Sequence, residues 1–264
     1  MHWEELTAAD FPEAVRKSDC VCLLPIGCVE KHGEHLPLGT DYLYIKHMAG
    51  EAAKLEPAVV FPHYWVGQIN CAKHCPGTIA IGHDMLMNLL EACCEEIARN
   101  GFDKIIIVNG HGGNTHFLRF FCQIMLEKKR DYVVFLYENQ PMSPEVAAML
   151  ETTNHAHGEE VETSRMLVVR PDTVKMDKVS NTGNPLGRMD AFTKKLFTGI
   201  FWYADYPTHY AGQAEYANAR KGEALVRDAA AKLAGVIRLS KTDRTPAQLQ
   251  AEFFQLAQQP LGRS

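Results

Sequence analysis

A mostly parallel α/β fold is predicted from three short apolar runs and the helical patterns between them. The runs cover residues 21–26, 105–108 and 132–137, and each is continuous enough to be a strand buried on both faces of a sheet. A weaker run covers residues 58–62. Strands that alternate with helices form a parallel sheet between two helical layers. We therefore expect a three-layer α/β/α sandwich in a single domain, residues 1–264.

The helical layers are predicted from apolar positions that recur at helical spacing. Asp84 is expected to cap one helix, which ends near Gly101 because glycine commonly terminates helices. Two more helices are expected over residues 41–54 and 114–129. A capping box at residues 245–248, with proline at the first helical position, is expected to open the last helix.

The segment at residues 171–222 has no clear period. It is rich in glycine, proline, asparagine and aromatic residues. A long irregular stretch of this kind usually forms a lid, a substrate wall or a subunit contact. A surface excursion with some short helix is an equally good interpretation.

The composition argues against several classes of partner. A net charge of −5, with scattered basic residues, gives no positive stripe for a nucleic-acid backbone. The N-terminus lacks the regions of a signal peptide, and no apolar run approaches the ~20 residues of a membrane helix. The eight cysteines are expected to be reduced and to pack as small apolar side chains. We therefore expect a cytoplasmic protein that binds neither nucleic acid nor membranes.

An unusual concentration of carboxylates and imidazoles follows the first predicted strand. In open α/β sheets, ligands bind beyond the carboxyl ends of the strands, which is where these residues lie. Glu30 and His32 are two positions apart, so in an extended loop both side chains point the same way. Carboxylate and imidazole together suit zinc, manganese, iron or nickel. Asp41 would complete such a site or bridge two ions; alternatively, it only caps the next helix.

Two further segments carry similar chemistry. His111 stands in a glycine-rich loop after another predicted strand, and glycine lets a ligand approach the backbone closely. A phosphate-binding loop is the weaker interpretation, because neither a GK[ST] nor a GxGxxG motif is present. Further along, Glu159, Glu160 and Glu162 repel one another unless they are solvated, at a helix N-terminus or near a cation. A metal site needs only Glu162 and the preceding His157 from this cluster.

Four ordered motifs closely resemble those of the creatininase (creatinine amidohydrolase) family. They read LPIGCVEKHGEHLPLGTD, HCPGT, NGHGGN and HGEEVETS, and a weaker similarity to the family follows at residues 217–222. The resemblance implies a three-layer α/β/α fold, hydrolysis of a non-peptide C–N bond, and a centre of two divalent metal ions. Zinc is the first choice of ion, with manganese and iron as alternatives. The resemblance also implies a small-molecule substrate and a homo-oligomer, a hexamer built from dimers.

The same resemblance assigns roles to individual residues. Position by position, the family's metal ligands fall on Glu30, His32, Asp41, His111 and Glu162. Asp41 corresponds to the ligand that bridges both ions, and His157 to the histidine that handles protons. His74, Gly112 and Asn114 are expected to contact the substrate, although His74 could equally be a wall residue.

The chain departs from true creatininases at positions that would surround creatinine. Gly113 stands where those enzymes have a glutamate ligand. Their tryptophans around the creatinine ring have no counterpart nearby, since no tryptophan occurs between Trp65 and Trp202. Lys31 and Glu34 also alter the first motif. Creatinine is therefore expected to be a poor substrate.

The sequence thus favours a metal-dependent amidohydrolase that acts on a cyclic amide or formamide of a small polar molecule. The ions would activate water and polarise the carbonyl, and His157 would deliver a proton to the leaving group. One alternative keeps this site but cleaves a C–C bond in an oxidised inositol, as another branch of the family does. A further alternative is a non-catalytic binding protein on the same fold, which an intact ligand set disfavours.

Overall fold

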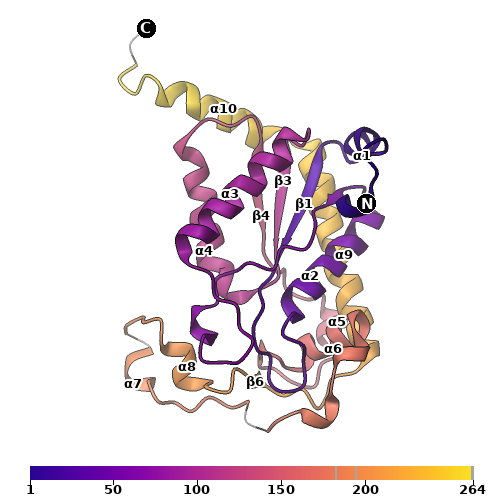
Figure 1. The fold of residues 1–264 in the computed structure, drawn as a ribbon, viewed down its shortest axis with the longest axis vertical. Helices are drawn as coiled ribbons and strands as arrows, with labels where there is room; N and C mark the ends of the chain where they lie inside the picture. The colour runs from indigo at the N-terminus through magenta and orange to yellow at the C-terminus, as the bar shows by residue number, and fades with distance from the viewer. Residues whose placement is uncertain (182, 194, 263–264) are drawn as a thin grey trace.

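Four parallel strands form the central sheet, in the order β2-β1-β3-β4 (Figure 1). The computed structural model describes residues 1–181, 183–193 and 195–262. The strands are β1 (Val21–Ile26), β2 (Val59–Val60), β3 (Lys104–Asn109) and β4 (Val133–Tyr137). Ile26 pairs with Asn109 in the register, so β1 and β3 end side by side. The polar segments that follow these two strands therefore start from neighbouring points.

Helices cover both faces of the sheet. One layer contains α2 (Thr40–Leu55), α6 (Glu160–Val169) and α9 (Ala219–Thr242), and the other contains α1 (Phe11–Lys17), α3 (His83–Arg99) and α4 (Thr115–Ile124). All of β1 is buried, because its side chains alternate between two apolar cores. Val21 and Leu23 pack with the first layer, and Cys22 and Leu24 with the second. The predicted three-layer α/β/α fold is confirmed.

Three residues that the sequence offers as helix caps do not cap their helices. Asp84 lies inside the first turn of α3, where the positive end of the helix dipole favours its charge. The last helix, α10 (Thr245–Ala257), has no capping box: the Thr245 N–H donates to Asp243 Oδ1 at 2.9 Å, so Asp243 satisfies this donor. Asp41 lies in the first turn of α2, after the N-cap residue Gly39, and makes no capping bond. Its carboxylate is therefore free for other contacts.

The segment at residues 171–222 runs beyond the carboxyl ends of the strands, at the end of the molecule opposite α10 (Figure 1). Its regular elements are α7 (Asp190–Thr193), α8 (Phe201–Asp205), β6 (Ala211–Gly212) and the start of α9. Positions 182 and 194 of the segment lie outside the described residues. Strand β6 pairs antiparallel with β5 (His155–His157), which holds the segment against the start of α6.

The remaining helices are short. They include α5 (Pro144–Ala147) and 3-10 turns such as Asn70–Ala72, Gly112–Asn114 and Met125–Glu127. The last of these turns ends the helix predicted at residues 114–129, whose α-helical part stops at Ile124. Within the described ranges, no helix is both long and apolar enough to cross a membrane.

Candidate metal centre

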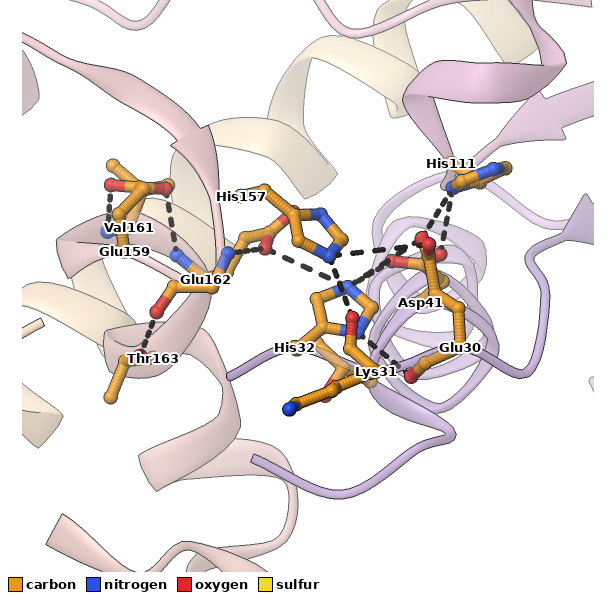
Figure 2. Close-up of polar contacts among 12 residues, drawn as sticks. Glu30, Lys31, His32, Asp41, His111, His157, Glu159, Val161, Glu162 and Thr163 are labelled. Carbon is orange, nitrogen blue, oxygen red and sulfur yellow. Dashed lines mark hydrogen bonds and ion pairs between the residues drawn. The ribbon is translucent and has the colours of Figure 1, made fainter. Parts of the chain in front are cut away.

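The five residues predicted to bind metal converge near the carboxyl ends of β1 and β3 (Figure 2). Glu30 and His32 come from the loop after β1, and Asp41 from the first turn of α2. His111 follows β3, and Glu162 lies in the first turn of α6. All except Glu162 are buried, and the Glu162 side chain is 24% exposed.

Asp41 joins two groups of potential ligands. Its Oδ2 lies 3.0 Å from His111 Nδ1, which is also 2.9 Å from Glu30 Oε1. Its Oδ1 lies 3.0 Å from His32 Nε2, which is also 3.7 Å from Glu162 Oε2. One carboxylate is thus shared between a Glu–His pair on each side, as a bridge between two cations would require.

Backbone contacts fix how the two imidazoles present their nitrogens. His111 Nε2 donates to the carbonyl of Gln68 at 2.9 Å, and His32 Nδ1 donates to the carbonyl of Glu30 at 3.2 Å. In the neutral rings, the other nitrogen of each therefore carries a lone pair that faces carboxylate oxygens. Glu30 Oε1 is moreover buried without a hydrogen-bond partner. A metal ion between these nitrogens and carboxylate oxygens would be bound by the lone pairs of both. A backbone carbonyl that accepts from the other ring nitrogen commonly orients a histidine that binds metal.

The buried carboxylates of the site need a positive charge beside them. Burial alone would lower the pKa of His32, but Asp41, Glu162 and Glu30 outweigh it and raise this pKa to about 10. At His111, burial again opposes the rise, and the neighbouring thiol and carboxylates take the pKa well above its usual range. Buried carboxylates need a compensating cation. Either protons on both imidazoles or divalent ions between the ligands supply it.

His157 lies beside both groups of ligands. Its ring stacks on that of His32, with centroids 4.1 Å apart, and its Nε2 donates to the carbonyl of Lys31 at 2.8 Å. The same nitrogen is 4.0 Å from Glu30 Oε2. Burial and the charge of His32 lower the pKa of His157, so its ring is neutral at neutral pH. A neutral imidazole at this place is suited to proton transfer or to metal binding, since His32, His157 and Glu162 also form a compact ligand trio.

A pocket of about 1220 Å³ opens onto these residues. His74 and Gly112, both predicted to contact the substrate, line it. Residues of the 171–222 segment form an apolar part of its wall: Phe197, Ile200, Phe201, Trp202 and Tyr203. Of the roles considered for this segment, the structure thus shows a pocket wall. It also corrects the expectation that no tryptophan is near the site, because Trp202 reaches it from far along the chain.

Asn114, the third predicted substrate contact, lies elsewhere. It is fully buried, does not line the pocket, and its Oδ1 accepts the N–H of Gln68 at 2.8 Å. Because the carbonyl of Gln68 accepts from His111, Asn114 supports the backbone that orients this imidazole. The structure therefore gives Asn114 a positioning contact in place of the predicted substrate contact.

His209 is a site residue that the sequence did not indicate. It is buried, and its Nε2 lies 2.6 Å from Glu30 Oε2. Trp202 Nε1 donates to His209 Nδ1 at 3.2 Å, so the ring proton is on Nε2 and points at Glu30. This bond occupies Oε2 and leaves Oε1 facing His111. A lone histidine in an irregular segment carries no motif, so only the folded chain shows this contact.

Comparison with known proteins places the chain in a family. The model of the creatininase family, described as creatinine amidohydrolase, matches residues 4–237. The chain belongs to the creatininase family. Creatininases are metal-dependent amidohydrolases, so the family resemblance and the enzyme class predicted from the sequence are both confirmed.

Curated members of the creatininase family differ in what they hydrolyse. A creatinine amidohydrolase of Pseudomonas putida is 30% identical over 66% of this chain and 74% of its own length. A 3-dehydro-scyllo-inosose hydrolase of Thermotoga maritima is 24% identical over 84% of this chain and 78% of its own. A mycofactocin precursor peptide peptidase of Mycolicibacterium smegmatis is 31% identical over 60% of this chain and 61% of its own. Family membership therefore leaves the substrate open.

Solved creatininase structures share the fold. A mutant creatininase of Zn-Zn type superposes with a TM-score of 0.77 at 23% identity, covering 92% of this chain and 98% of that one. A manganese creatininase gives a TM-score of 0.77 at 22% identity, covering 92% and 99%.

Removing the His209 imidazole tests its contact with Glu30. We expect His209→Gln to lower metal affinity by about 10- to 100-fold, the usual effect of losing a partner behind a metal ligand. Excess metal should restore turnover, because the ligands themselves remain. Metal titration of the variant measures the change. His74→Gln, which alters another histidine of the same pocket, is the control and should bind metal like the wild type; equal affinities for all three proteins would show that His209 does not position Glu30.

Proposed function

We propose that this chain is a two-metal hydrolase that cleaves a non-peptide C–N bond, in a cyclic amide or formamide of a small polar molecule. The observation that carries the proposal is the position of Asp41, whose two oxygens each lie 3.0 Å from a nitrogen of a different imidazole. Family membership supports the reaction type, since the matching family model is described as creatinine amidohydrolase.

The ligands divide into two sets that share Asp41. Glu30, His111 and Asp41 Oδ2 would hold one ion, and His32, Glu162 and Asp41 Oδ1 the other. Carboxylate and imidazole donors suit zinc, manganese or iron, and the similar solved creatininases of Zn-Zn and manganese type support the first two. We place zinc first.

Bound ions of this kind activate water and polarise a carbonyl. The chain supplies the rest of the mechanism. The pocket wall at residues 197–203 presents apolar surface to the substrate. His157 is held beside the ligands by the bond from its Nε2 to the carbonyl of Lys31. The nitrogen of the neutral ring that can accept a proton is therefore Nδ1, and we assign proton delivery to the leaving atom to the His157 ring. A neutral ring, which the lowered pKa ensures, can accept a proton and pass it on.

Ring opening of an oxidised inositol is the second candidate reaction. The similarity to a 3-dehydro-scyllo-inosose hydrolase extends over 84% of this chain and favours it. Both reactions use the same ligands and the same pocket. A non-catalytic binding role is the third candidate, and the complete set of ligands argues against it.

We also propose that creatinine is a poor substrate. A Cβ at Gly113 would lie 2.5 Å from His111 Nε2 and 2.8 Å from the carbonyl of Gln68, so no carboxylate side chain fits there. The glutamate ligand expected of true creatininases is therefore excluded by packing. A lack of tryptophan near the site cannot be used to argue against creatinine as a substrate, because Trp202 lines the pocket.

A substrate panel tests the proposed reaction. Lactams, formamides, oxidised inositols and creatinine should be compared at saturating zinc and manganese. We expect the best turnover with a cyclic amide or formamide, and creatinine below it by more than about tenfold, or roughly 1.4 kcal/mol of transition-state stabilisation. An oxidised inositol as best substrate would select the second candidate, and creatinine within tenfold of the best substrate would contradict the argument from Gly113.

We further propose that the whole chain acts as one creatininase-like domain, in the cytoplasm, as a homo-oligomer such as a hexamer. Exposed apolar side chains at Leu196, Phe197 and Ile200 support self-association, because contiguous apolar surface commonly marks a protein interface.

A further inference from the structure

Cys28 lies against one of the two proposed ion positions. It follows β1 by two residues and is fully buried. Its Sγ is 3.1 Å from Asp41 Oδ2, the oxygen that faces His111. One donor atom from each of Cys28, Glu30, Asp41 and His111 lies within 4.8 Å of the others. The two-metal proposal uses three of these four residues and leaves the thiol without a role.

Two observations on its neighbours indicate an ion at this point. Glu30 Oε1 is completely buried and has no hydrogen-bond partner, although it lies 2.9 Å from His111 Nδ1. In the neutral ring that binds a metal, this nitrogen carries the lone pair, because Nε2 donates to the carbonyl of Gln68. An unpartnered carboxylate oxygen and an imidazole lone pair thus face the same place that the thiol faces.

The donor atoms of this set are those of a zinc site. Sulfur, imidazole nitrogen and carboxylate oxygen are the ligand types of zinc, which prefers four ligands in tetrahedral arrangement. A thiolate is a soft ligand, and it favours zinc or cobalt over manganese or magnesium. The ligand group that contains His32 and Glu162, together with His157, includes no cysteine among the described residues. The two positions would therefore differ in the ions that they prefer.

We infer that Cys28 is the fourth ligand of the ion held by Glu30, Asp41 and His111, and that it makes this position selective for thiophilic ions. The inference rests on the proposed two-metal function. On binding, the S–H bond of Cys28 is replaced by an S–metal bond, and the proton passes to solvent. In the competing role, Cys28 stays protonated, binds no metal and only donates a hydrogen bond to Asp41 Oδ2.

Cobalt substitution distinguishes these roles without an activity assay. The full-length protein is stripped of metal and titrated with Co²⁺ while its absorption spectrum is recorded. We expect visible cobalt bands together with a near-ultraviolet band from sulfur-to-cobalt charge transfer. Cys28→Ser should lose the near-ultraviolet band. Cys71→Ser is the control, at a cysteine that lines the pocket but is not in the ligand group, and it should keep the band.

Metal selectivity provides a second measurement. Cys28→Ser should bind zinc at least about tenfold more weakly, in line with the loss of a contact at a metal site, while its manganese affinity stays near that of the wild type. Visible cobalt bands without the charge-transfer band in the wild type would overturn the inference and leave the two-metal proposal intact. A wild-type protein that binds no cobalt would overturn both. The wild-type spectrum decides even if Cys28→Ser fails to fold.

Discussion

Asp41→Ala is expected to lose both metal ions and to reduce turnover to background. Each oxygen of this carboxylate faces a different imidazole at 3.0 Å, so its removal opens both proposed ion positions at once. No nearby side chain replaces it, because Glu30 belongs to one group of ligands and Glu162 to the other. Elemental analysis of the purified variant and kcat with the best substrate measure the effect.

Asp84→Ala is the matched control for this variant. Asp84 occupies the same place in the first turn of α3 that Asp41 occupies in α2, but it is exposed. Its removal should leave metal content and turnover unchanged. Such a result would show that losing a carboxylate from the first turn of a helix does not by itself reduce metal binding. Circular dichroism confirms that both variants are folded. Full metal occupancy and activity in Asp41→Ala would refute the bridging role.

His157→Asn is expected to retain both ions while kcat and kcat/KM fall alike, by about 10²- to 10⁴-fold, the usual contribution of a proton-transfer residue. The ring is neutral, buried and held by the carbonyl of Lys31, with Nε2 4.0 Å from Glu30 Oε2. Loss of the ring removes an interaction made in the transition state, which is why both constants fall together. Steady-state kinetics at saturating metal measure the loss.

The competing role for His157 is metal ligation, because it forms a compact trio with His32 and Glu162. In that case His157→Asn should bind metal more weakly, and excess metal should restore kcat. His155→Asn provides the control from the same strand: His155 contacts Glu159 and does not line the pocket, so its removal should change kcat little. Rescue of His157→Asn by added metal would overturn the assignment of proton transfer.

Much of the fold is predictable because buried parallel strands have a local signature. The runs at residues 21–26, 105–108 and 132–137 are apolar throughout, since both faces of these strands are covered, and each coincides with a strand to within one residue at either end. The rule that ligands bind beyond the carboxyl ends of such strands then brings Glu30 and His111 together before any coordinates are known. Their register in the sheet explains why: β1 and β3 are neighbours, paired from Val21 to Ile26.

The rest of the site depends on contacts that no local pattern encodes. His209 meets Glu30 across 179 positions of sequence, and Trp202 reaches the pocket from the same irregular segment. Cys28 is expected from the sequence to be a small apolar side chain, because burial is the usual state of a free cysteine. Its position beside Asp41 depends on how the loop after β1 lies against the start of α2. Asn114 shares a motif with His111, yet its side chain turns to the backbone of Gln68.

The ion content of the purified wild-type protein tests the two-metal proposal most directly. Elemental analysis should find two divalent ions per chain, with zinc the first of them, and their removal by a chelator should abolish hydrolysis. Adding back zinc or manganese should restore it, because the ligands are supplied entirely by this chain. Full hydrolysis by a protein shown to be free of metal would contradict the proposal.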